Sequence, residues 1–154
     1  MPSKPWACRS KTLTPTPKPC GILRAMSDAD IETLRAAFEA ASRGDWDVLV
    51  RVAHPDFELK TQLVGTHRGH EEVRRFFEDR WEAFEEVVVE PEEFLQVGDR
   101  IVTRVLIRAR PRRGTSAILE IRHGEVWTMR DGKAARLETF PKFEEALEAV
   151  GLSE

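Results

Sequence analysis

The chain has 154 residues, 41% of them hydrophobic and 33% charged, and its net charge is −3. One domain is expected at this length, and a composition this apolar excludes a wholly disordered chain. The acidic balance argues against a general nucleic-acid-binding protein, and no stretch approaches the roughly 18 consecutive apolar residues of a membrane-spanning helix. We therefore expect neither nucleic acid nor a membrane as a partner, and a cytoplasmic location is the default.

Residues 1–25 differ in composition from the rest of the chain. They hold five basic residues, no acidic residue, five of the nine prolines, and both cysteines, Cys8 and Cys20. This composition predicts a disordered tail, and two cysteines confined to it are weak support for a disulfide or a metal site. The tail could bind an acidic partner, act as a transit-like leader, or extend upstream of the natural start. The third interpretation is favoured because Met26 directly precedes a helix start, so the domain is expected over residues 26–154.

Two helices are expected at the beginning of this domain. Ser27 and Asp30 resemble a capping box, and Gly44 fits the end of the first helix. The apolar residues between them recur at helical spacing: Ile31, Leu34, Phe38 and Ala41. Asp45 caps a second, short helix, which the His-Pro-Asp segment at 54–56 is expected to end. The apolar residues of that helix are Trp46, Leu49 and Val52.

A strand, a loop and a third helix are expected next. Residues 57–63 alternate between apolar and polar side chains, as in a half-buried strand, and Thr61 is the polar member of the inward set. The segment Gly-Thr-His-Arg-Gly-His at 65–70 is expected to be a loop. His67 and His70 could line the mouth of the cone there, but the favoured interpretation is that they are solvated loop residues. The third helix carries an aromatic and apolar side, which consists of Val73, Phe76, Phe77, Trp81 and Phe84.

Beyond residue 86 the hydrophobic period changes to two, which indicates antiparallel strands. Strands are expected at residues 87–89, 94–97, 101–110, 116–130 and 134–140. Pro91 belongs at an edge or a bulge, and Asp131-Gly132 forms the last hairpin, before a short closing helix. Helices followed by a strongly curved antiparallel sheet predict an α+β cone, with helices on one face and a hollow inside. A basic stripe is expected on a solvated or dimer-facing surface of the sheet: Arg104, Arg108, Arg110, Arg112 and Arg113.

One face of the strand at 116–130 combines apolar and ionisable residues. The residues that share it are Leu119, Ile121, His123, Glu125, Trp127 and Met129. Because four of these six are large and apolar, this face is taken as inward, which points His123 and Glu125 into the cone about 7 Å apart. Such a pair can do general acid–base work, with Trp127 as an apolar wall for a ring-shaped ligand. Gly124 leaves an alternative open, a bulge that would turn both residues to a solvated rim.

Further ligand-binding candidates come from the inward sides of the other elements. They are Thr61, Phe38, Phe77 and Trp81. His54 and Asp56 flank a proline, where aspartate most often caps a turn. The four histidines have no spacing typical of metal ligands, so neither a metal nor a cofactor is expected.

Four stretches of the sequence, in order and spacing, resemble the SnoaL-like group of the nuclear transport factor 2-like superfamily. They are R-G-D-W-D-V-L (43–49), H-P-D-F-E-L (54–59), G-T-H-R-G-H-E-E-V (65–73) and V-W-T-M-R-D-G-K (126–133). The resemblance covers about residues 27–150. It implies an α+β cone of the cystatin-like roll type, commonly a homodimer through the open sheet face, with a pocket inside the cone. Known members include isomerases, polyketide cyclases, epoxide hydrolases, dehydratases and non-catalytic modules, so this fold does not select one function.

Residue by residue, the resemblance does not extend to the known active sites. It puts Thr61 where ketosteroid isomerases place a base aspartate, and the chain contains no tyrosine to serve as their oxyanion donor. The Asp-Arg-Asp set of epoxide hydrolysis cannot be placed on inward positions. SnoaL-type cyclases use a late-strand aspartate, and the final strand here offers Glu138, whose facing the pattern leaves open.

Two hypotheses follow from the sequence. In the first, the protein binds a hydrophobic cyclic small molecule and uses His123 and Glu125 as a cofactor-independent isomerase, cyclase, dehydratase or hydrolase. In the second, it is a non-catalytic dimeric binding or scaffold module with a residual pocket.

Overall fold

The computed structural model describes residues 28–62, 64–113 and 117–152, so the expected tail and the Ser27 cap lie outside the described residues. The helices are α1 (Asp28–Arg43), α2 (Trp46–Arg51), α3 (Gly69–Trp81) and α4 (Phe143–Ala149). The strands are β1 (Ala53–Thr61), β2 (Gly65–Arg68), β3 (Phe84–Val97), β4 (Arg100–Pro111), β5 (Leu119–Arg130) and β6 (Lys133–Phe140). Within these described ranges no helix is both long enough and apolar enough to span a membrane.

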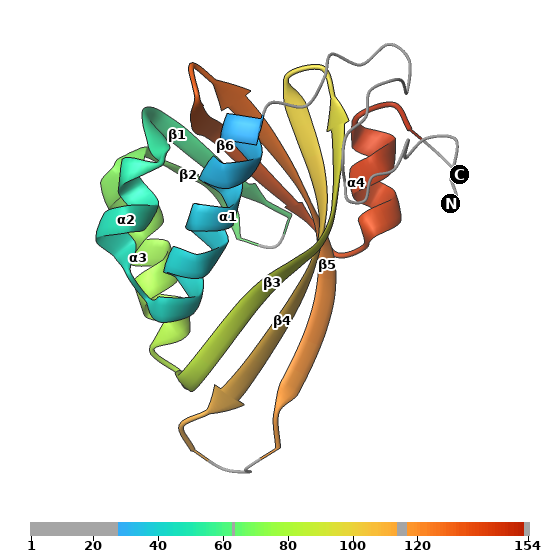
Figure 1. Ribbon diagram of the computed structural model, residues 1–154. Coiled ribbons are helices and arrows are strands. Elements are labelled where there is room, and N and C mark those ends of the chain that lie inside the picture. The colour runs from blue at the N-terminus through green and yellow to red at the C-terminus, as the bar shows by residue number, and fades with distance from the viewer. Residues whose placement is uncertain (1–27, 63, 114–116, 153–154) are drawn as a thin grey trace.

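The strands form one curled, unclosed sheet in the order β2-β1-β6-β5-β4-β3. Neighbouring strands are antiparallel except β1 and β6, which run parallel. Figure 1 shows α1, α2 and α3 together on one side of the sheet and α4 on the other, with the far ends of β4 and β5 projecting past the helices. This arrangement confirms the predicted α+β cone.

Two hydrophobic clusters lie on the two sides of the sheet. The larger cluster packs α1–α3 against the concave side, and α1 contributes Leu34, Phe38 and Ala41 at the spacing read from the sequence. The smaller cluster joins α4 to the convex side through residues such as Leu147 and Val126. Burial of a large aliphatic side chain contributes roughly 1.5–3 kcal/mol to the stability of the fold. Burial in these two clusters therefore explains why α1–α3 lie on one side of the sheet and α4 on the other.

Several predicted features of the chain path are confirmed. The Asp45 carboxylate accepts a hydrogen bond from the Val48 amide and caps α2. Pro91 lies in β3, which is an edge strand, at a register shift against β4. Asp131 and Gly132 both have positive φ, at 54° and 79°, as the expected hairpin turn requires.

The prediction of a loop at residues 65–70 is wrong. Residues 65–68 form β2, which pairs with β1 so that Leu59 stands opposite His67, and α3 begins at Gly69. The ring of His67 packs 4.7 Å from that of Phe76, and Nε2 of His70 lies 3.1 Å from two backbone carbonyls of β1. Neither histidine is therefore a free loop residue, because each is held by β1 or α3.

Two further boundaries differ from expectation. Phe84 is the first residue of β3 and not part of α3, which ends at Trp81. The segment 54–56 does not separate α2 from the strand but lies inside β1. It occupies a register shift, since Ala53 pairs with Ala134 and the ladder resumes only at Glu58. A local irregularity in pairing therefore absorbs the proline without ending the strand.

Gly124 does not bulge β5. The ladder with β4 is continuous from Ala109↔Leu119 to Arg100↔Thr128, and Gly124 also pairs in register with Phe140 of β6. A Cβ at position 124 would lie 2.8 Å from Cα of Phe143 and 2.9 Å from Cβ of Ala146. The glycine is therefore needed for the close approach of α4 to the convex side, and the alternation of side chains along β5 is preserved.

Candidate ligand-binding site

A cavity of about 580 Å³ lies between the concave side of the sheet and helices α1–α3. Its size is within the range of small-molecule sites, roughly 300–1,000 Å³. Its lining includes every site residue expected from the sequence: His123, Glu125, Trp127, Thr61, Phe38, Phe77 and Trp81. Sequence reasoning missed several other lining residues, among them the polar Gln62, Arg80 and Thr139.

Aromatic side chains form part of the cavity wall and are held by contacts with other rings and with the backbone. The ring of Phe38 meets that of Trp127 edge-on at 5.8 Å, and Trp46 stacks on Phe77 at the same distance. The indole N–H of Trp81 donates to the carbonyl of Ala41 over 2.7 Å. Edge-to-face and stacked pairs of this kind contribute about 0.5–1.5 kcal/mol beyond area burial, so the wall is preorganised.

The polar end of the cavity is a chain of three side chains on β5. Nε2 of His123 lies 2.8 Å from Oε2 of Glu125, and the indole N–H of Trp127 donates to Oε1 over 2.9 Å. All three project from the same side of the strand because they are two residues apart. Both carboxylate oxygens of the buried Glu125 are thus occupied, which satisfies a charge that would be costly to bury alone.

The electrostatic surroundings of His123 favour the charged form of its imidazole. Burial lowers the pKa of His123, but the hydrogen bond and the negative charge of Glu125 outweigh burial and raise this pKa above its ordinary value. The contact through Nε2 makes that nitrogen the donor to the carboxylate. Among the described residues no group hydrogen-bonds Nδ1, so Nδ1 is the ring atom available to a ligand.

Comparison with known proteins assigns the family. Residues 34–137 match the SnoaL-like domain. The chain belongs to the SnoaL-like family. Its fold and the order of its motifs agree with that membership, while no curated protein matches the chain.

Three solved structures of similar proteins each match three quarters or more of this chain. TerC, co-crystallised with polyporic acid, is 27% identical with a TM-score of 0.66, and the match covers 80% of this chain and 98% of TerC. An NTF2-like protein of unknown function from Burkholderia pseudomallei K96243 is 26% identical with a TM-score of 0.66, over 82% and 99% of the two chains. An uncharacterized cystatin-fold protein from Novosphingobium aromaticivorans is 21% identical with a TM-score of 0.63, over 75% and 98%, and supports the fold alone.

Two residues that the family comparison raised do not supply an acid or base to the cavity of this SnoaL-like protein. The Thr61 hydroxyl accepts a hydrogen bond from the Val64 amide and donates to the Gly65 carbonyl, so it is engaged in the β1–β2 turn. The Glu138 carboxylate lies 3.6 Å from Nζ of Lys60 and does not line the cavity. Of the described residues that line the cavity, only His123 has an imidazole and only Glu125 has a carboxylate.

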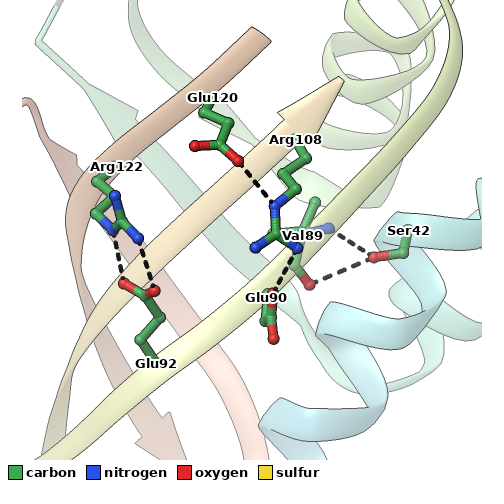
Figure 2. Close-up of polar contacts among 7 residues, drawn as sticks. All are labelled: Ser42, Val89, Glu90, Glu92, Arg108, Glu120 and Arg122. Carbon is green, nitrogen blue, oxygen red and sulfur yellow. Dashed lines mark hydrogen bonds and ion pairs between the residues drawn. The ribbon is translucent and has the colours of Figure 1, made fainter. Parts of the chain in front are cut away.

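The convex surface of β3–β5 carries an ion-pair lattice, which contains part of the predicted basic stripe. Figure 2 shows Arg108 between Glu90 and Glu120, and Arg122 against Glu92. On the opposite side, Ser42 of α1 exchanges two hydrogen bonds with the backbone of Val89 (Figure 2). The lattice thus covers the face turned away from the cavity, while α1 is fixed to the edge strand β3.

Proposed function

We propose that this SnoaL-like protein binds a hydrophobic, ring-shaped small molecule in its cavity and that His123 is the group that reacts with it. The observation that carries the proposal is the His123–Glu125 pair, a hydrogen-bonded acid–base pair in a cavity whose walls are otherwise mostly apolar. TerC, at 27% identity, was crystallised with polyporic acid, which supports a small-molecule role for the shared fold.

The geometry supports proton transfer without a cofactor. In the neutral form, Nδ1 of His123 can take a proton from a carbon next to a ligand carbonyl, and the electron pair of the broken C–H bond moves to the carbonyl oxygen. The resulting imidazolium is stabilised by the Glu125 carboxylate, and the same proton can return to another atom of the ligand. Because Glu125 raises the pKa of His123, the imidazole holds the abstracted proton more strongly than an isolated histidine would. Isomerisation, cyclisation and dehydration all need such a transfer.

Within this scheme Glu125 acts through His123 and not on the ligand. Its two oxygens are taken by the His123 and Trp127 rings, so it orients the imidazole and stabilises its charged form. The wall of aromatic rings would hold a flat or cyclic ligand against the imidazole.

A thermal-shift screen with cyclic ketones, lactones and epoxides tests the binding proposal. We expect at least one class to raise the melting temperature of the wild type, and the increase to shrink in His123→Ala and Glu125→Gln. Glu138→Gln is the matched control, since Glu138 is outside the cavity. No stabilisation of the wild type, or stabilisation equal in all four proteins, would reject the site.

The second candidate is a non-catalytic binding module, and one observation favours it: the His123–Glu125–Trp127 chain satisfies its own hydrogen bonds without a ligand. Proton exchange separates the two candidates. If His123 is a base, the wild type should speed deuterium incorporation next to the carbonyl of a bound cyclic ketone in D₂O. His123→Ala should lose this exchange, while a module would bind the ketone without exchange in either protein.

A further inference from the structure

The cavity has a defined direction, which follows from exposure along the inward side of β5. Leu119 and Ile121 are 43% and 53% exposed, whereas Glu125 and Trp127 are 6% and 5% exposed. His123 stands between these two pairs. Leu119 and Ile121 thus lie on the side that the sequence predicted to be inward, but they are exposed near the projecting end of the sheet. Ile121 marks the mouth of the cavity and Trp127 its floor.

A second hollow of about 420 Å³ adjoins this mouth. The two hollows share the residues Arg80, Trp81, Ile107 and Ile121. The outer hollow continues along β5 to Leu119, and its lining is mainly apolar. A ligand longer than the inner cavity would therefore pass over Ile121 and beside Arg80.

Arg80 places a positive charge at this junction. It lies in the last turn of α3, and its guanidinium carbon is 4.2 Å from the centroid of the Phe76 ring. Arg74 and Arg75 of the same helix each contact a carboxylate. Among the described residues, no carboxylate oxygen lies within 4.0 Å of the Arg80 guanidinium nitrogens. Of the described residues that line the inner cavity, Arg80 alone is permanently cationic, while Asp79 lines only the outer hollow.

The two ends of the cavity differ in unpaired charge. The Glu125 carboxylate at the inner end is already hydrogen-bonded to His123 and Trp127, whereas the Arg80 guanidinium at the mouth has no carboxylate partner among the described residues and attracts an anionic group. A guanidinium also binds a carboxylate in a bidentate geometry that no other side chain offers. The cavity is therefore suited to a molecule with an apolar inner end and an anionic outer end.

We propose that the ligand is an amphipathic organic acid, bound with its carboxylate at Arg80 and its apolar ring system extending inward to His123. This inference rests on the proposed ligand-binding function and names the substrate class for it. His123 lies two residues inward from Ile121 along β5, a spacing of roughly 7 Å, so the ring system must extend past Ile121 by about that distance to reach His123.

The test is a calorimetric titration with anthracene-2-carboxylic acid and its neutral counterpart anthracene-2-carboxamide. We expect the acid to bind the wild type about tenfold more tightly than the amide, a preference that falls with added salt. Arg80→Gln should abolish the preference and leave amide binding unchanged, and Arg80→Lys should keep part of it. Arg75→Gln, on the same helix but outside both hollows, should behave as the wild type.

The possible outcomes separate this inference from the one on which it rests. Equal affinity of the two probes for the wild type, or a preference that survives in Arg80→Gln, would overturn the anionic class while leaving ligand binding intact. A lower melting temperature of Arg80→Gln with an unchanged preference would make Arg80 a structural residue, which also overturns the inference. If neither probe binds the wild type, the inference fails, and the thermal-shift screen with cyclic ketones, lactones and epoxides decides whether the ligand-binding function fails with it.

Discussion

Nε2 of His123 and Oε2 of Glu125 lie 2.8 Å apart at the inner end of an apolar cavity, on neighbouring inward positions of one strand. The contact fixes the imidazole with Nε2 toward the carboxylate, and among the described residues no hydrogen bond engages Nδ1. It also couples the charge of the histidine to that of the glutamate, so that each of the following predictions about protonation depends on this pair.

Glu125→Gln should lower the pKa of His123. Burial, which lowers this pKa, would remain, while the hydrogen bond to a carboxylate and its negative charge, which raise it, would be lost. We expect the pKa to move from above to below the ordinary value of histidine, as measured by NMR of the imidazole Cε1–H. Glu138→Gln should leave it unchanged. A pKa that stays raised in Glu125→Gln would show that another group supports the charge.

The stability that His123 contributes should decline as pH rises. The folded-state pKa is raised, so the folded protein binds the proton more tightly than the unfolded chain does. The contribution is complete below the unfolded pKa of histidine and is lost as pH passes through the raised folded pKa. Urea unfolding of wild type and His123→Gln between about pH 5.5 and pH 9 should give a stability difference that shrinks with pH. A difference that is constant or grows with pH contradicts the sign.

Gly124→Ala should destabilise the fold by about 1–3 kcal/mol, because the new methyl group overlaps backbone and Cβ atoms of α4. Chemical denaturation measures the loss. Glu120→Ala is the control, since Glu120 is an exposed residue on the same side of β5. If Gly124→Ala is as stable as the control, α4 must be able to move away from the sheet without cost.

The homodimer implied by the family resemblance can be tested at the ion-pair lattice. A two-fold axis through the open face would bring arginines of one protomer to glutamates of the other, since such an interface is self-complementary. We expect light scattering to give a dimer for the wild type and a monomer for Arg108→Glu. Lys60→Glu changes a residue of β1 that lies next to Glu138 of β6, and this variant should remain dimeric. A wild-type monomer, or a dimer unaffected by Arg108→Glu, would exclude this face.

Periodicity in the sequence predicted most of the fold, because alternation along long strands and helical spacing are local properties. The direction of His123, Glu125 and Trp127 followed from a period of two and needed no other segment. β2 was missed because its four residues show no alternation, and only pairing with β1 makes them a strand. The glycines of the segment 65–70 indicated a loop, and that indication was misleading.

The features that the sequence left open or did not reveal depend on distant residues. Whether Gly124 marks a bulge or a close contact is decided by α4, which begins nearly 20 positions further along the chain. The exposure of Ile121 depends on where α3 ends over the sheet, and hydrophobicity cannot show that. Arg80 was overlooked because a charged residue in the last turn of a helix reads as a solvated end. Its place at the cavity mouth appears only in three dimensions.

The most direct test of the central claim is an NMR titration of the wild type with whichever cyclic compound stabilises it. The resonances to follow are the imidazole nitrogens of His123 and the indole N–H of Trp127. We predict that saturating ligand shifts both, with the larger nitrogen shift at Nδ1 of His123, and that the indole of Trp46 moves less because Trp46 does not line the cavity. If the ligand saturates the protein while His123 and Trp127 stay unshifted, the molecule binds elsewhere and the account of this cavity is wrong.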